Sequence, residues 1–209
     1  MLKVKTHSLI KGFDKHNSIY NDSYFKGIET YAVQSSKIIA NSILELFSPK
    51  SIVDLGCGTG DLLNEFQKLQ VKSFGIDYSE SALYLCKQKG LSVLKIDLEN
   101  ETVPNHIKSD VALCTEVAEH LPESCSDNLI KNLCGISKII IFTAAPPGQG
   151  DVEHHDHVNE QPPIYWVNKF KNFGYSLDLD KTRILQKTWE INNVSSFYYQ
   201  NLMVFLKNL

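Results

Sequence analysis

Acidic and histidine side chains gather in two short stretches of the chain. The first stretch, ExxEH, contains Glu116, Glu119 and His120, and the second contains His157 at the end of a histidine-rich run. A neutral imidazole can take a proton from a hydroxyl group, and carboxylates with imidazoles can bind a hard divalent ion such as Mg²⁺ or Mn²⁺. Two chemistries are therefore open: acid–base catalysis by His157, Glu116 and His120, or a metal site formed by all four residues.

The spacing within ExxEH bears on both chemistries. If this stretch is helical, its three ionisable residues lie at i, i+3 and i+4 and share one helix face. His157 has the alternative of anchoring its loop through a hydrogen bond. We interpret the neighbouring His154 and His155 as solvated or as part of the rim of a substrate site.

A glycine-rich loop, DLGCGTG, runs from Asp54 to Gly60. Glycines let the backbone approach a ligand closely and turn sharply from a strand into a helix. Asp77 ends the next strand, where a carboxylate can accept both ribose hydroxyls of a nucleoside. Asp97 ends the third strand, where the carboxylate or its neighbouring backbone can recognise an adenine amino group. The pattern predicts a site for a nucleoside-containing ligand.

Alternating strands and helices must position these groups. Apolar runs predict strands over 51–55, 71–77, 92–96, 110–114, 138–143, 174–179 and 201–206. Amphipathic spacing predicts helices over 34–47, 61–70, 79–89, 122–134 and 164–173. This alternation predicts an α/β fold with a doubly wound parallel sheet. Residues 144–163 contain four prolines and three histidines and are predicted to form a long loop, of a kind that is usually functional.

The glycine loop and the strand ends resemble those of class I S-adenosylmethionine (SAM)-dependent methyltransferases. The matching pieces are VDLGCGTG (53–60), GIDYS (75–79), KIDLE (95–99) and CTEVAEHLP (114–122), in the order usual for that family. The resemblance implies a Rossmann-like, mostly parallel seven-stranded sheet with an antiparallel last strand. It also implies a single domain over 1–209, with an N-terminal helical lid (1–48), a SAM-binding half (49–145) and an acceptor-binding half (146–209).

The resemblance further implies what individual residues do. The glycine loop with Asp54 holds the methionine part of SAM, Asp77 holds the ribose, and Asp97 lies at the adenine edge. Glu116 follows the fourth strand and faces both cofactor and acceptor. The cofactor-binding residues implied in this way are Asp54, Gly56, Cys57, Gly58, Gly60, Asp77, Tyr78, Asp97, Leu98 and Glu116.

A dinucleotide-binding oxidoreductase is the main competing class. Its fingerprint, G-x-G-x-x-G, would need a third glycine at the position of Asp61. An acid at a helix N-terminus repels a pyrophosphate, whereas the sulfonium cofactor has no phosphate to repel. Asp61 therefore favours the methyltransferase.

Three resemblances concern the acceptor. EVAEH is widespread in methyltransferases similar to the ubiquinone-biosynthesis enzymes. The segment HVNEQPPIYW (157–166) resembles the loop of methyltransferases that are encoded with bacterial polysaccharide genes. ExxEH together with Asp156-His157 resembles the metal quartet of small-RNA 2′-O-methyltransferases, which implies Glu116, Glu119, His120 and His157 as ligands. The aromatic continuation of that last family is missing here.

Composition limits the partners. The net charge is −3, and Arg183 is the single arginine among 21 cationic side chains. This balance argues against a nucleic-acid partner, which usually requires a basic excess. Five cysteines without CxxC spacing, no apolar leader and no apolar run of membrane-spanning length predict a cytoplasmic protein without a membrane span.

The sequence thus predicts a SAM-dependent O-methyltransferase that acts on a small polar acceptor. The preferred acceptor is a small-molecule or nucleotide-linked glycan precursor of a surface polysaccharide (capsule), methylated at a sugar hydroxyl or a phosphoramidate oxygen. The alternatives are a metal-dependent RNA 2′-O-methyltransferase and a ubiquinone-biosynthesis-like O-methyltransferase. A divalent ion (Mg²⁺ or Mn²⁺) as a second cofactor and a homodimer both stay open.

Overall fold

The computed structural model describes residues 22–150 and 157–209, with side chains from residue 34 onwards. Helices and strands alternate through the first half of this region, except that the fourth strand follows the third without a helix between them, and an antiparallel pair of strands then completes the sheet. The helices are α2 (Asp22–Phe47), α3 (Asp61–Lys68), α4 (Glu80–Gln88), α5 (Ser126–Ile136), α6 (Pro163–Asn172), α7 (Leu179–Ile191) and α8 (Ser196–Gln200). The strands are β1 (Ser51–Leu55), β2 (Lys72–Asp77), β3 (Val93–Lys95), β4 (Val111–Thr115), β5 (Ile139–Thr143), β6 (Tyr175–Leu177) and β7 (Met203–Lys207).

The seven strands form one sheet in the order β3-β2-β1-β4-β5-β7-β6. The five strands from β1 to β5 are parallel, and β7 pairs antiparallel with both β5 and β6. The predicted seven-stranded Rossmann-like sheet with an antiparallel last strand is confirmed. The strand order reverses between β1 and β4, and the crevice at such a switch point is where open α/β sheets bind ligands.

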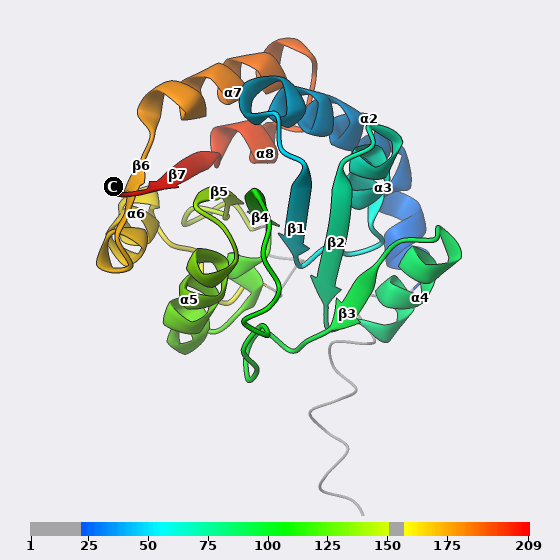
Figure 1. The fold of residues 1–209 in the computed structure, drawn as a ribbon, viewed down its shortest axis with the longest axis horizontal. Helices are drawn as coiled ribbons and strands as arrows, with labels where there is room; N and C mark the ends of the chain where they lie inside the picture. Colours follow the sequence, from blue (N-terminus) through cyan, green and yellow to red (C-terminus); the bar gives the residue numbers. More distant parts are fainter. Residues whose placement is uncertain (1–21, 151–156) are drawn as a thin grey trace, which may run out of the picture.

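Helices cover both faces of the sheet (Figure 1). One buried cluster joins the sheet to α2, α3 and α7 through side chains such as Ile43, Phe66 and Trp189. The other joins it to α5 and α6 through Leu133, Trp166 and further apolar residues. The strands β1, β4, β5 and β7 contribute to both clusters because successive side chains point to opposite faces.

Several element boundaries differ from the sequence predictions. Helix α2 begins at Asp22, within the segment predicted to be a lid. Helix α5 begins four residues after the predicted position 122, because Glu123–Cys125 forms a separate 3-10 turn. The region between 180 and 200, which shows no clear period in the sequence, forms α7 and α8. Ser79 caps α4 by accepting a hydrogen bond from the amide of Ala82, as its residue type predicts.

No helix in the described ranges combines the length and the apolar character that crossing a membrane requires.

Candidate cofactor and acceptor site

The glycine loop connects β1 to α3 with three glycines at positive φ. Gly56, Gly58 and Gly60 have φ values of 77°, 52° and 77°. A Cβ on Gly56 would lie 2.3 Å from Val117, and one on Gly60 would lie 2.5 Å from Leu91. A Cβ on Gly58 would meet nothing within 4 Å. Two of the glycines therefore permit close packing, whereas Gly58 exposes backbone on an open side of the loop.

Asp77, at the end of β2, is joined directly to this loop. One carboxylate oxygen accepts a hydrogen bond from the amide of Gly58, and the other accepts one from the amide of Ser79, each at 2.8 Å. Burial raises the pKa of Asp77, and these amides act in the opposite direction. Each carboxylate oxygen can accept a second hydrogen bond, so the residue keeps acceptor capacity for ribose hydroxyls.

Asp54 is the second-last residue of β1 and the first residue of the glycine-rich loop. Its side chain is buried, and one of its carboxylate oxygens has no hydrogen-bond partner among the described residues. Burial, with the nearby charge of Asp77, raises the pKa of Asp54 to about 7. A buried carboxylate in need of a partner suits a cationic group such as the ammonium of a methionine moiety. The residues at this strand end therefore fit SAM.

The residues at the predicted adenine edge have fewer free polar groups for a ligand than Asp54 and Asp77 have. Asp97 accepts hydrogen bonds from the amide of Glu99 at 2.9 Å and from the side chain of Asn100 at 2.8 Å, so it caps a turn. Leu98 is buried in the core, and only its backbone could meet an adenine. Tyr78 is partly buried, which raises its pKa to about 12. Cys57 is buried in the loop with its thiol pKa raised, as expected of an unreactive cysteine.

The ExxEH stretch does not form the α-helix that the spacing suggested. Glu116 has a positive φ of 54°, and only Ala118–His120 form a 3-10 turn. Its amide donates to the hydroxyl of Thr143 at 2.9 Å, which ties this strained residue to the end of β5. Glu119 and His120 therefore lie together on a tight turn after β4, and the three residues do not form the shared helix face that the spacing suggested.

Three of the four predicted metal ligands converge. Glu119, His120 and His157 each place one potential ligand atom within 4.8 Å of those of the other two. The rings of His120 and His157 meet edge to face with centroids 4.9 Å apart. Glu116 points instead into a polar network, where its carboxylate accepts from Asn201 at 3.1 Å and from Gln149 at 3.4 Å.

Glu119 is the most deeply buried member of the cluster. Its side chain is inaccessible to solvent, and neither carboxylate oxygen has a hydrogen-bond partner among the described residues. Burial, reinforced by the charge of Glu116, raises the pKa of Glu119 to about 9. A buried acid without partners is costly to retain and commonly marks a functional position.

Glu160 positions His157, although the sequence analysis did not single it out. Its carboxylate contacts His157 Nδ1 at 2.8 Å and accepts from the amides of Gly148 and Gly150, each at 2.6 Å. A carboxylate on one ring nitrogen fixes the tautomer and leaves Nε2 for a ligand or a proton. A glutamate three residues after a candidate histidine was the available signal.

Backbone hydrogen bonds fasten the His157 segment to the ExxEH turn. The amides of Val158 and Asn159 donate to the carbonyl of Glu119 at 2.9 and 3.0 Å. The side chain of Asn159 is buried and donates to the carbonyl of Ala118 at 3.3 Å. His154, His155 and Asp156 lie outside the described residues, as does Tyr20 of the predicted lid.

Comparisons with known proteins agree with this geometry. Residues 53–135 match a family model described as a methyltransferase domain. Because the matched stretch is less than half of the chain, it shows similarity to a methyltransferase domain over those residues.

Relatives and solved structures extend this result. The ubiquinone biosynthesis O-methyltransferase of Pseudoalteromonas translucida is 30% identical over 111 residues, and that of Colwellia psychrerythraea is 34% identical over 86. These alignments cover 50% and 38% of this chain, and 47% and 35% of the relatives, so the similarity spans at most about half of each protein. The fold is similar to magnesium protoporphyrin IX methyltransferase (ChlM) from Synechocystis PCC 6803 with bound SAH (TM-score 0.63, 19% identity, 95% of both chains).

The methyltransferase match ends well before the His157 segment. It includes Asp54, the glycine loop, Asp77 and the ExxEH turn, but neither His157 nor Glu160. The similarity to methyltransferases therefore rests on residues 53–135, and the His157 segment must be interpreted from its own residues.

Proposed function

We propose that the protein is a SAM-dependent O-methyltransferase whose acceptor oxygen is prepared at the Glu119–His120–His157 cluster. The convergence of these three side chains is the observation that carries the proposal. Asp54 and Asp77 lie at the carboxyl ends of β1 and β2, and Glu116 directly follows β4, so the cofactor residues and the cluster share one edge of the sheet. Ligand and reacting groups meet at that edge in folds of this type.

The reaction needs little covalent chemistry from the protein. SAM supplies the methyl group, and the domain places the acceptor in line with it. As the carbon–oxygen bond forms and the carbon–sulfur bond breaks, the hydroxyl proton passes to Nε2 of His157. The contact of Nδ1 with Glu160 holds the ring in place and stabilises the imidazolium that results.

A divalent ion offers the second version of the same site. Glu119, His120 and His157 provide one oxygen and two nitrogen ligands, a donor set that suits Mn²⁺ better than Mg²⁺, which prefers oxygen ligands. Such an ion would lower the pKa of a bound hydroxyl. The unpartnered oxygens of Glu119 support this version, because an ion supplies the missing partner.

The proposed acceptor is a small-molecule or nucleotide-linked precursor of a surface polysaccharide, at a sugar hydroxyl or a phosphoramidate oxygen. Its support is the segment HVNEQPPIYW, in which Asn159 anchors the segment and Trp166 packs in the core. A ubiquinone-type acceptor is the second candidate, and the two ubiquinone biosynthesis relatives favour it. An RNA 2′-hydroxyl has the metal-like cluster in its favour and the single arginine against it.

Methyl transfer from labelled SAM separates these acceptors. We would offer nucleotide-activated sugars, ubiquinone precursors and short RNA, each with EDTA and with added Mn²⁺. Transfer to activated sugars supports the proposal, and transfer to RNA alone contradicts it. Activity that survives EDTA assigns His157 as the base, whereas activity restored by Mn²⁺ assigns the cluster as a metal site.

A further inference from the structure

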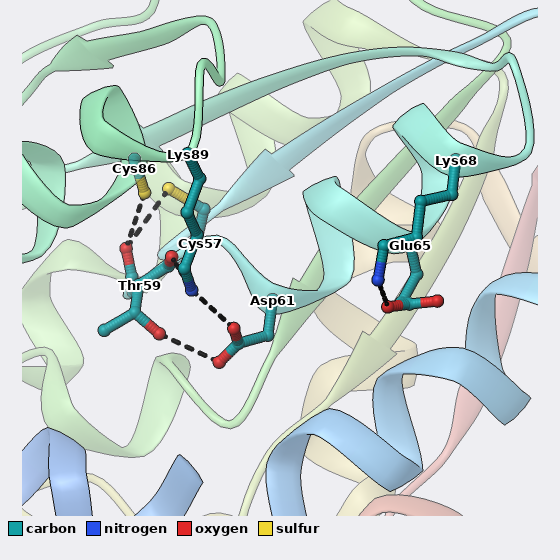
Figure 2. Close-up of polar contacts among 8 residues, drawn as sticks. Cys57, Thr59, Asp61, Glu65, Lys68, Cys86 and Lys89 are labelled. Carbon is teal, nitrogen blue, oxygen red and sulfur yellow. Dashed lines mark hydrogen bonds and ion pairs between the residues drawn. The ribbon is translucent and has the colours of Figure 1, made fainter.

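Lys89 joins helix α4 to the glycine loop. It follows the last residue of α4, and its ammonium group donates to the carbonyl of Thr59 at 3.0 Å and pairs with the carboxylate of Asp61 at 2.6 Å (Figure 2). The side chains of Lys89 and Asp61 are 29% and 16% exposed. This partial burial makes the pair stronger than an ion pair in open solvent.

Asp61 contacts both Lys89 and Thr59. Its second oxygen accepts a hydrogen bond from the hydroxyl of Thr59 at 2.9 Å. Asp61 is also the first residue of α3, where the positive end of the helix dipole favours an acid. Lys89, Thr59 and Asp61 therefore form a closed ring of contacts around the turn from loop to helix.

Cys86 lies three residues before Lys89, on the same side of α4. Its thiol donates to the carbonyl of Gly58 at 3.2 Å (Figure 2). The amide of Gly58 in turn donates to Asp77. Two successive loop carbonyls are thus held by α4, and the amide beside them is held by the carboxylate assigned to the ribose.

This loop needs external support. Gly56, Gly58 and Gly60 give it a large conformational freedom in the absence of contacts. Ordering such a segment on ligand binding costs free energy, and a loop that is already ordered binds more tightly. The open side of Gly58 remains available to a ligand while α4 holds its carbonyl.

We propose that Lys89 is a positioning residue for SAM, which acts through Thr59 and Asp61 to hold the glycine loop in the conformation that receives the cofactor. The inference rests on the proposed function, because it assumes that the loop binds SAM. Lys89 adjusts cofactor affinity without taking part in methyl transfer.

Isothermal titration of S-adenosylhomocysteine (SAH) into Lys89→Met, Lys89→Arg and the full-length wild-type protein tests this. We expect Lys89→Met to weaken SAH binding about tenfold, which corresponds to about 1.4 kcal/mol. Lys89→Arg keeps a cation and should restore most of the affinity. Lys87→Met, which removes an exposed lysine from the same helix, is the matched control.

Two further readouts separate positioning from a structural defect. In Lys89→Met the KM for SAM should rise about tenfold, by the same loss of about 1.4 kcal/mol, while kcat at saturating SAM stays unchanged. Hydrogen exchange of the 56–61 amides should be faster without ligand and equal to wild type when SAH saturates the site. Asp61→Asn, which keeps Lys89, should shift both readouts in the same direction.

Each contrary result has a distinct meaning. Wild-type affinity and loop exchange in Lys89→Met would overturn the inference. So would a reduced melting temperature of the cofactor-free protein that Lys89→Arg does not restore, because this indicates a purely structural contact. A wild-type protein that binds no SAH would instead refute the proposed function.

Discussion

The glycine loop and the ExxEH turn differ in how completely their polar groups are paired by hydrogen bonds. Around the glycine loop, Asp77 accepts a hydrogen bond from the amide of Gly58. Lys89 donates to the carbonyl of Thr59 and pairs with Asp61. At the ExxEH turn, Glu119 is more deeply buried, and neither of its carboxylate oxygens makes a well-formed hydrogen bond to the described residues, although the amides of Glu119 and Ala145 and the carboxyl of Glu116 lie near enough to act on its pKa. The glycine loop is organised before any ligand arrives, and near it only one oxygen of Asp54 lacks a hydrogen bond among the described residues. At the ExxEH turn both carboxylate oxygens of Glu119 lack one.

This difference indicates where specificity resides. A loop that is already ordered binds one cofactor with little reorganisation. A buried acid beside two imidazoles awaits an ion or an acceptor to complete it. Substitutions in the first region should therefore change cofactor affinity, and substitutions in the second should change turnover or metal affinity.

Asp77→Ala should have the largest effect and act on affinity. It removes the partner of the Gly58 and Ser79 amides as well as the proposed ribose acceptor. We expect SAH binding to weaken at least about a hundredfold, since hydrogen bonds to a charged group contribute about 1.5–3 kcal/mol each. Calorimetry measures this, with the exposed Asp180→Ala as control. An affinity near that of the control would remove Asp77 from the site.

His157→Ala should act on turnover instead. We expect kcat to fall about a hundredfold, as is typical when a general base is lost. SAH affinity should stay that of the wild-type protein, because His157 is not among the residues assigned to the cofactor. Steady-state kinetics and calorimetry on the same preparations measure the two quantities, with the exposed His106→Ala as control. Unchanged turnover would exclude His157 as base and as ligand.

Glu119→Gln tests, through the pH dependence of stability, whether the buried carboxylate of Glu119 lacks hydrogen-bond partners. Burial raises the pKa of Glu119 to about 9 in the folded protein, from 4.5 for a glutamate in the unfolded chain. Because the folded value is the higher one, this residue costs the folded state stability progressively as pH rises from 4.5 towards 9.

The amide variant carries no such cost. Without divalent ions we expect it to melt about 5 °C above wild type at pH 8 and close to wild type at pH 5. Thermal unfolding measures this, with Glu123→Gln as an exposed control. If Mn²⁺ raises the melting temperature of wild type but not of Glu119→Gln, the cluster binds the metal. Identical pH profiles for the two proteins would show that burial does not perturb Glu119.

Asp97→Ala should have the smallest effect. Its carboxylate already caps a turn through Glu99 and Asn100. We expect SAH affinity to fall only about threefold, in keeping with a net hydrogen-bond contribution of about 0.5–1 kcal/mol. Competition between SAH and labelled SAM is sensitive enough to detect this. A loss as large as that of Asp77→Ala would place Asp97 in the main cofactor contacts.

The fold could be predicted where local pattern and final packing coincide. The strands from β1 to β5 are short apolar runs that end at turns, and the glycine loop marks the first of them. The start of α2 and the helices α7 and α8 could not be placed, because their apolar residues do not follow a clear period. For α7, packing against the sheet decides the conformation, with Trp189 fully buried.

The site was predictable in its residue types more than in its geometry. ExxEH suggested a helix, yet Glu116 adopts a conformation that non-glycine residues rarely take. The parts played by Glu160 and Lys89 depend on contacts across distant segments, with Gly148 and Thr59. No spacing rule in the sequence reports such contacts, because lysines and glutamates on a chain of this composition are usually solvated.

The place of β7 in the sheet governs the order in which the protein can mature during synthesis. β7 lies between β5 and β6, and within the described part of the chain β6 pairs with β7 alone. Asn201, just before β7, is also the residue that reaches back to Glu116. While the ribosome is still adding the residues of β7, the edge of β5 stays open and the polar network around Glu116 is incomplete. The nascent chain can thus assemble the strands β1 to β5 early. The contact of Asn201 with Glu116 forms only after β7 has inserted between β5 and β6.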